Sequence, residues 1–218
     1  DRAYQVKHKV IVEYVRDQDL TEPLKPLFSV APFGMKLLEG DSPYFGVAQA
    51  DESKQGPGCL PGLHAPNGTT TGIFTDYLGR KFSGHWVVKP GREINRTLVT
   101  PLMHLPFDTT LHYVAVHLHP FAETLELRDL TTNKTIFKSR AKGFKKGIGL
   151  ADVQTLSNTE GIPMFKDHEY ELVSVYNNTS GIDQDAMATF FLYLLDKEFQ
   201  KPTMVSVNPQ QAAATHPQ

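Results

Sequence analysis

Two histidines separated by one residue, His117 and His119, lie in the apolar segment LHYVAVHLHP (111–120). The alternation of this segment is typical of a β-strand, in which residues two apart share a face and lie about 6.5–7 Å apart. Two imidazoles at that spacing can converge on one metal ion. Histidines on a strand also occur on solvated faces or bonded to the backbone, so the pattern alone leaves a metal site and a polar surface as alternatives.

A metal site needs a third protein donor, for which the sequence offers a methionine and several histidines. Met187 opens the aromatic-rich segment AMATFFLYLL (186–195) after the polar turn GIDQD. Its alternative role is core packing, which is what most methionines do. The histidine candidates are His64 and His168, with His85 and His104, either of which could approach the site, and His112, which should face the other way. Cys59 and His64 could also form a weak zinc or copper motif of their own.

The elements that must position these side chains are predicted to be short strands. Alternating residues rich in β-branched and aromatic types indicate strands at 4–15, 81–89, 94–102, 109–119, 124–130, 134–140, 168–176 and 186–195. Residues 141–164 are less regular and predict at most a short helix. Many short strands separated by turns, with little helical periodicity, predict an all-β fold, an antiparallel β-sandwich of jelly-roll-like form.

The length of 218 residues suits one large all-β domain or two small ones. We expect a single domain over residues 1–207 and a disordered polar tail over 208–218. A long Gly/Pro-rich loop at 51–72 is predicted to be functional or mobile, or to mark a domain boundary. The single cysteine excludes an intrachain disulfide, and the chain has no apolar run long enough to span a membrane. A formal net charge of −2 gives no reason to expect nucleic acid as a partner.

The order of these features resembles a known family. His-x-His on a strand, followed 187 − 119 = 68 residues later by a methionine that opens an aromatic strand, is similar to the second copper domain of the type II, ascorbate-dependent copper monooxygenases. These include peptidylglycine α-hydroxylating monooxygenase and dopamine β-monooxygenase. The matching segments are WVVKPG (86–91), HEYELVSVYNNT (168–179) and DQDAMATFFLYL (183–194). The resemblance covers residues 82–196, about half of the chain.

The resemblance implies that His117, His119 and Met187 are the three protein ligands of one copper ion. Imidazoles suit copper in both oxidation states, and a soft thioether favours Cu(I). Such a site leaves one position open for water, dioxygen or another donor. Zinc is the alternative metal.

The sequence departs from the family at the residues that the two-copper reaction needs. The chain has no His-His pair for a second copper. The positions of the residues that bind the substrate carboxylate in the peptide-hydroxylating branch are Ala115, Thr189 and Phe191 here, and the family's cysteine after the methionine is Ala188. These departures count against peptide hydroxylation while leaving copper binding intact.

The sequence therefore predicts a copper-binding protein rather than an enzyme, for uptake, delivery or sequestration of copper outside the cytoplasm, either periplasmic or secreted. A copper-donor or copper-acceptor protein is the expected partner. One alternative is a copper-dependent monooxygenase or oxidase that uses this site with dioxygen and a reductant. The other alternative is a structural or adhesive β-sandwich without a metal.

Overall fold

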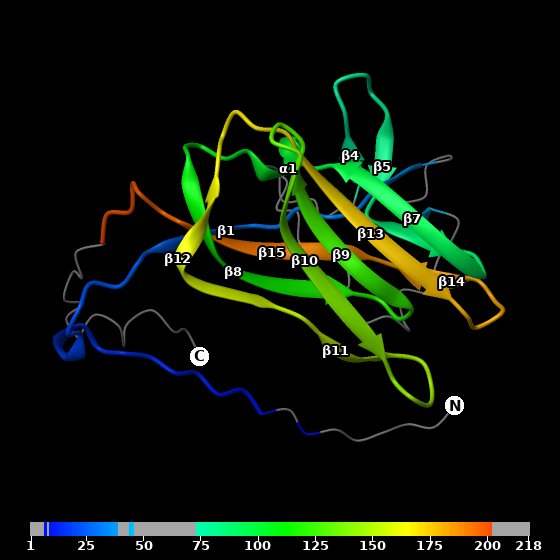
Figure 1. Ribbon diagram of the computed structural model, residues 1–218, viewed down its shortest axis with the longest axis horizontal. Helices are drawn as coiled ribbons and strands as arrows, with labels where there is room; N and C mark the ends of the chain where they lie inside the picture. The colour runs from blue at the N-terminus through cyan, green and yellow to red at the C-terminus, as the bar shows by residue number, and fades with distance from the viewer. Residues whose placement is uncertain (1–6, 8, 39–43, 46–72, 202–218) are drawn as a thin grey trace, which may run out of the picture.

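The computed structural model describes residues 7, 9–38, 44–45 and 73–201. Its two main sheets are antiparallel and pack against each other, which confirms the predicted antiparallel β-sandwich (Figure 1), and among the described strands only β3 and β6 pair in parallel. The predicted loop at 51–72 and the predicted tail at 208–218 lie outside the described residues. None of the helices in the described residues has the length and apolar character that crossing a bilayer would need.

The first main sheet contains four strands, in the order β1 (Leu27–Val30), β15 (Ala188–Leu195), β8 (Thr109–Leu118) and β12 (Leu156–Met164). The second contains five, in the order β11 (Leu150–Val153), β10 (Lys134–Gly143), β9 (Ala122–Asp129), β13 (Tyr170–Asn178) and β7 (Gly91–Leu98).

Two smaller sheets have three strands each. One has the order β14 (Gln184–Ala186), β6 (His85–Val88) and β3 (Tyr44–Phe45), and the other has the order β2 (Lys36–Leu37), β5 (Lys81–Ser83) and β4 (Ile73–Thr75). In the described residues the helices are a 3-10 turn, Asp17–Asp19, and the four-residue α1, Thr100–Met103.

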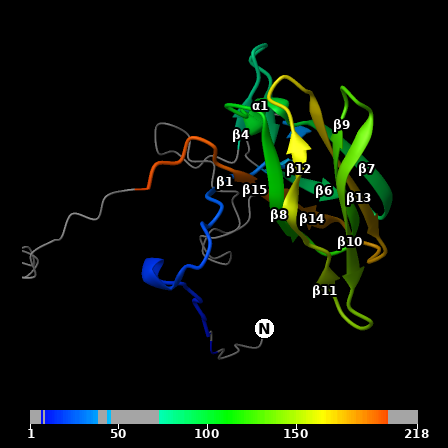
Figure 2. The ribbon, with the colours of Figure 1, turned by 60° about the vertical axis from the view of Figure 1, so that its left-hand side comes forward.

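The hydrophobic core lies between the two main sheets, which face each other as two layers (Figure 2). Leu125 and Leu127 of β9 are two residues apart and point inward together, as a strand period of two requires. They belong to the same buried cluster as Val114 of β8 and Phe190 of β15. Trp86 of β6 joins this cluster and is fully buried. The small β14-β6-β3 sheet is thereby fixed to the sandwich.

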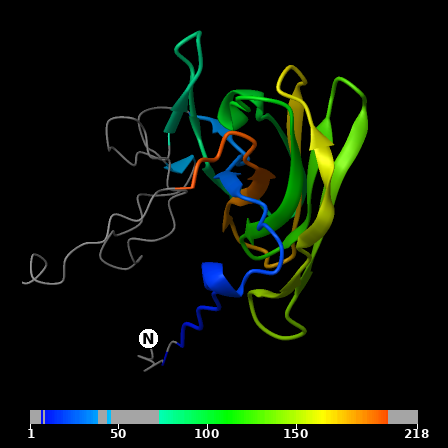
Figure 3. The same ribbon diagram turned by 90° about the vertical axis from the view of Figure 1, so that its left-hand side faces the viewer.

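The strand predicted at 4–15 is wrong for the part that the structure describes. Residues 9–15 form no regular strand, and their side chains are exposed. The segment runs apart from the two sheets (Figure 3). Its alternating apolar pattern suits a strand, but no described strand pairs with it, and an extended segment without a partner makes no ladder of hydrogen bonds.

The irregular segment predicted at 141–164 is also wrong, because it contains β11 and β12. The register of β12 against β8 shifts between Ser157 and Ile162. Gly161, within this shift, has a φ of 84°, a backbone conformation that glycine adopts without strain. The shift breaks the alternation that would have marked the strand.

Two other predicted strands are shorter than expected. The predicted strand at 81–89 is divided at Gly84 into β5 and β6, which belong to different sheets. The one at 94–102 ends at Leu98, and the chain turns into α1, where Pro101 is in the first turn. Proline suits that position because the first turn has no internal partner for its N–H.

Candidate metal centre

His117 of β8 and His119, the residue that follows the end of β8, lie on one face, as the alternation predicts. Val116 and Leu118 project from the other face and pack against the core. The ring centres of the two histidines are 5.3 Å apart, with an angle of 72° between the ring planes. The pair therefore lies outside the apolar core, on the far side of the first main sheet.

β8 is irregular at its beginning. The register of β15 against β8 shifts between Tyr193 and Leu194, because His112 is an extra residue in β8 and forms a β-bulge. Leu111 is consequently part of the core and does not extend the face of His117. The bulge lies in the first half of the strand, away from the end at which His117 and His119 lie.

Met187 lies at the junction of β14 and β15, where the chain passes from a small sheet into a main sheet. The register of β14 against β6, continued by one residue, places Met187 opposite His85. The register of β15 against β8 places it opposite His119, whose N–H donates to the Met187 carbonyl oxygen at 3.3 Å. Residues directly opposite on antiparallel strands share a face. Met187 is buried, and it lies near His85 and His117.

Asp185 of β14 connects two of the histidines and was missed by the sequence prediction. One of its carboxylate oxygens lies 3.2 Å from Nδ1 of His85, and the other lies 3.1 Å from Nδ1 of His119. The rings of His85 and His119 have centres 5.7 Å apart. The signal that could have found Asp185 is its position two residues before Met187, which places both on one face of a strand.

The carboxylate of Asp185 is ionised at neutral pH. Burial alone would raise its pKa, but the hydrogen bonds from His119 and His85 outweigh burial and lower the pKa to about 2. An ionised carboxylate can only accept hydrogen bonds, so Nδ1 of each histidine must carry a hydrogen. His119 Nδ1 also lies 3.3 Å from the backbone carbonyl oxygen of Asp185, a second acceptor. Neutral His119 therefore has its lone pair on Nε2.

His117 has a buried ring nitrogen, Nε2, with no hydrogen-bond partner among the described residues. Burial lowers the pKa of His117 below its ordinary value, and the nearby His119 and His85 lower it further. A neutral imidazole is the form that binds a metal ion. A buried polar atom without a partner costs about 1–3 kcal/mol of stability, so this nitrogen calls for an explanation.

Tyr176 of β13 fixes the backbone next to the histidines. Its hydroxyl donates a hydrogen bond to the carbonyl oxygen of Met187 and lies 3.4 Å from the backbone nitrogen of His119. Its ring meets Trp86 edge to face at 5.8 Å between ring centres. Burial raises the pKa of Tyr176, so the hydroxyl keeps its hydrogen. The chain around Met187 is thus held by the core behind it.

The donor set fits a metal ion that accepts nitrogen and sulfur. Two imidazoles bound to one ion at a tetrahedral angle have ring centres about 5 Å apart, because each metal–nitrogen bond is about 2 Å long. The spacing of His117 and His119 matches this separation. In the described part of the chain, no group of three or more histidine, cysteine, aspartate and glutamate side chains is arranged to hold a metal ion. The thioether of Met187, which lies near His117, is a further donor of the kind that such an ion accepts.

The remaining histidine candidates lie elsewhere or have other partners. His112 is bonded through Nε2 to the Thr110 hydroxyl at 2.8 Å and through Nδ1 to the Asn158 carbonyl oxygen at 2.9 Å. His104 and His168 line a different cavity of about 220 Å³, whose lining includes neither His117 nor His119. Cys59 and His64 lie outside the described residues.

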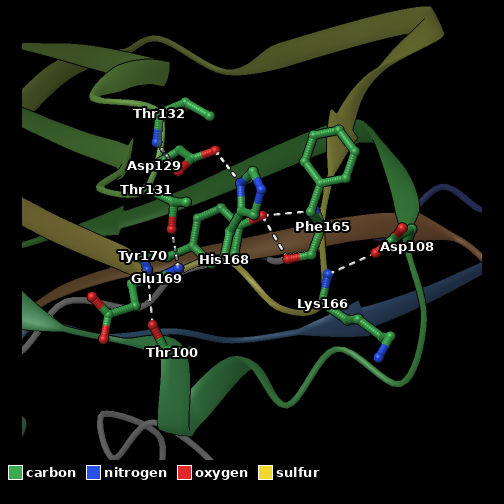
Figure 4. A network of polar contacts seen from close by, with 10 residues as sticks. All are labelled: Thr100, Asp108, Asp129, Thr131, Thr132, Phe165, Lys166, His168, Glu169 and Tyr170. Carbon is green, nitrogen blue, oxygen red and sulfur yellow. Dashed lines mark hydrogen bonds and ion pairs between the residues drawn. The ribbon is translucent and has the colours of Figure 1, made fainter.

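His168 forms its own network with Asp129 at the end of β9 (Figure 4). Its Nδ1 lies 2.7 Å from a carboxylate oxygen of Asp129, and its ring packs against Phe165 with 4.6 Å between ring centres. The Asp129 carboxylate also accepts the backbone N–H of Thr132 at 3.0 Å. These contacts join the turn after β9 to the turn before β13, which is a structural role.

Replacing Asp129 by asparagine should make stability less dependent on pH in acid. Burial alone would raise the pKa of Asp129, but the hydrogen bonds from Thr132 and His168 lower it below its ordinary value. A carboxyl group with a lowered folded-state pKa adds stability above pH about 4, and this contribution is lost as pH falls through the folded-state pKa. Urea unfolding at a series of pH values should give wild-type and Asp129→Asn curves that converge below pH about 4. Curves that stay parallel would contradict this role.

No family model matches the chain, and no curated protein and no solved structure matches it either.

Proposed function

We propose that this protein binds one copper ion through Nε2 of His117, Nε2 of His119 and the thioether of Met187. The observation that carries the proposal is the buried Nε2 of His117, which has no partner in the described residues. A bound metal ion would give this nitrogen the partner that it lacks. A solvated polar face would not bury the atom, and a structural histidine would bond it, as His112 does.

The choice of copper follows from the donors. Imidazole nitrogens are ligands for both zinc and copper, whereas a thioether is a soft donor that favours Cu(I). Met187 is opposite His119 in register and lies near His117, which supports its sulfur as a donor to the pair. Bound copper would be a redox-active centre, and a soft donor set would favour its reduced state. Zinc, which gains little from sulfur in a thioether, is the competing metal.

We propose a role in copper delivery or sequestration outside the cytoplasm rather than catalysis. Thr189 stands where the peptide-hydroxylating family has a substrate-binding residue, and it is buried opposite His117 with its hydroxyl facing no partner among the described residues. Ala115 and Phe191 pair with each other across β8 and β15 and offer no polar group to a substrate. The location rests on the family resemblance, and a copper-donor or copper-acceptor protein is the implied partner.

Metal binding tests this function directly. The wild-type protein is expected to bind one copper ion per chain, with Cu(I) affinity measured by competition against a chromogenic chelator. His117→Ala should lose stoichiometric binding. Met187→Leu, which keeps the volume of the side chain, should weaken Cu(I) at least tenfold and change zinc affinity little, because only the soft donor is removed.

The control is His168→Asn. It removes a histidine that is bonded to Asp129 and lines a cavity whose lining includes neither His117 nor His119. It should leave copper binding unchanged. A wild-type protein that gains no copper on incubation would support the structural β-sandwich instead. Equal loss of zinc and Cu(I) in Met187→Leu would argue against the thioether as a ligand.

A further inference from the structure

Asp185 is shared between two imidazoles on different strands. Its two carboxylate oxygens accept hydrogen bonds from Nδ1 of His119 on one side and Nδ1 of His85 on the other. His85 is only 2% exposed, and its backbone N–H donates to the Ser83 hydroxyl at 3.0 Å. The carboxylate is therefore fixed by the buried His85 of β6, and it in turn holds His119, the residue that follows the end of β8.

We propose that Asp185 is the positioning residue of the metal centre, which sets the orientation of His119 so that Nε2 faces the metal position beside His117. The inference rests on the proposed copper site, because it assigns a role within that site. Asp185 does not bind the metal itself in this proposal. This agrees with the finding that, in the described residues, no three side chains of histidine, cysteine, aspartate or glutamate are arranged to hold a metal ion. His85 acts as the anchor of the carboxylate.

The physical reason is the tautomer and the ring orientation. His119 Nδ1 has two acceptors, the Asp185 carboxylate at 3.1 Å and the Asp185 backbone carbonyl at 3.3 Å, so both contacts require a hydrogen on that nitrogen. The lone pair of the neutral ring is then on Nε2. A carboxylate on the far nitrogen also makes the ligating nitrogen more basic, and loss of such a partner commonly weakens metal binding 10- to 100-fold.

A purely structural role would look different. Asp129, which also bonds a histidine, additionally accepts a backbone N–H at the turn that it stabilises. Both oxygens of Asp185 are instead directed at imidazoles, one of which is a proposed ligand. Asp129→Asn is thus the matched control for a change at Asp185.

The test compares Asp185→Ala and Asp185→Asn with Asp129→Asn in the full chain. Copper affinity is measured by chelator competition, and the electron paramagnetic resonance spectrum of bound Cu(II) reports the nitrogen ligands. Asp185→Ala is expected to weaken copper binding 10- to 100-fold and to broaden the spectrum into more than one species. Asp185→Asn keeps one acceptor oxygen and should restore part of the affinity. Asp129→Asn should bind copper as the wild type does.

A second measurement does not depend on any variant folding. Nitrogen chemical shifts of the metal-free wild type should show His119 with its hydrogen on Nδ1. A hydrogen on Nε2 would overturn the proposal, and so would Asp185→Ala that binds copper with wild-type affinity and spectrum. If neither the wild type nor any variant binds copper, the proposed function fails. If His117→Ala abolishes binding while Asp185→Ala does not change it, only the role of Asp185 fails.

Discussion

Replacing His117 by leucine is expected to stabilise the metal-free protein while removing its response to copper. The buried Nε2 of His117 has no partner among the described residues, and such an atom costs about 1–3 kcal/mol. Leucine has a similar size and no polar atom to bury. We therefore expect the free energy of unfolding of the metal-free variant to rise by about 1 kcal/mol. Copper at a hundred times its dissociation constant should stabilise the wild type by about 2.7 kcal/mol and the variant not at all.

Urea unfolding with and without copper measures both effects in one experiment. The matched control is His112→Leu on the same strand, because both ring nitrogens of His112 are hydrogen-bonded. That change should cost about 1–3 kcal/mol in the metal-free protein, since it leaves its partners unpaired, and should keep the response to copper. If His117→Leu instead destabilises the protein as His112→Leu does, and copper still stabilises it, His117 has a structural role.

Trp86→Ala is expected to cause the largest loss of stability in the protein, about 3–5 kcal/mol. Trp86 is fully buried and is the largest side chain of the core. Its Nε1 donates to a carboxylate oxygen of Glu93 at 3.1 Å, and its ring contacts Tyr176 edge to face. The ring also approaches Gly34 so closely that a Cβ there would lie 3.3 Å from it. Truncation would leave a cavity that the surrounding strands cannot fill.

Denaturant unfolding of the metal-free protein measures this loss. Trp86→Phe keeps a ring but removes the hydrogen bond to Glu93, so its cost should be intermediate. Tyr77→Ala, at a side chain that is 93% exposed, should change stability by no more than about 0.5 kcal/mol. A cost below about 1 kcal/mol for Trp86→Ala would show that β6 contributes little to the sandwich. Trp86→Ala should also bind copper more weakly, because Trp86 is adjacent to His85, which anchors the carboxylate of Asp185.

The strand pattern was sufficient to predict the sandwich and the shared face of His117 and His119. Both follow from a period of two, which depends only on local sequence. The strand predicted at 4–15 has the right pattern, but its described part, 9–15, pairs with no described strand, and pairing is a property of the whole fold. β12 was missed because a shift of register next to Gly161 breaks its alternation.

The residues alone offered Met187 as one of several candidate third donors, and only the family resemblance favoured it over the histidines. Sequence alone gave no reason to prefer His85 over the other histidine candidates, because β6 meets β14 through a pairing between residues about 100 positions apart. Asp185 was passed over for the same reason, since its contact with His119 spans 185 − 119 = 66 residues. Pairing between strands distant in sequence is the information that a single sequence does not contain.

The junction of β14 and β15 bears on whether the protein folds before or after it binds a metal ion. The side chains around Met187 come from β6, β8 and this junction, which meet through long-range pairings. Such pairings form slowly, since closing long loops costs entropy before any contact is gained. Under the copper proposal, the chain therefore finishes folding before it can acquire its ion. A copper-donating protein would then transfer its ion to a chain that is already folded and metal-free.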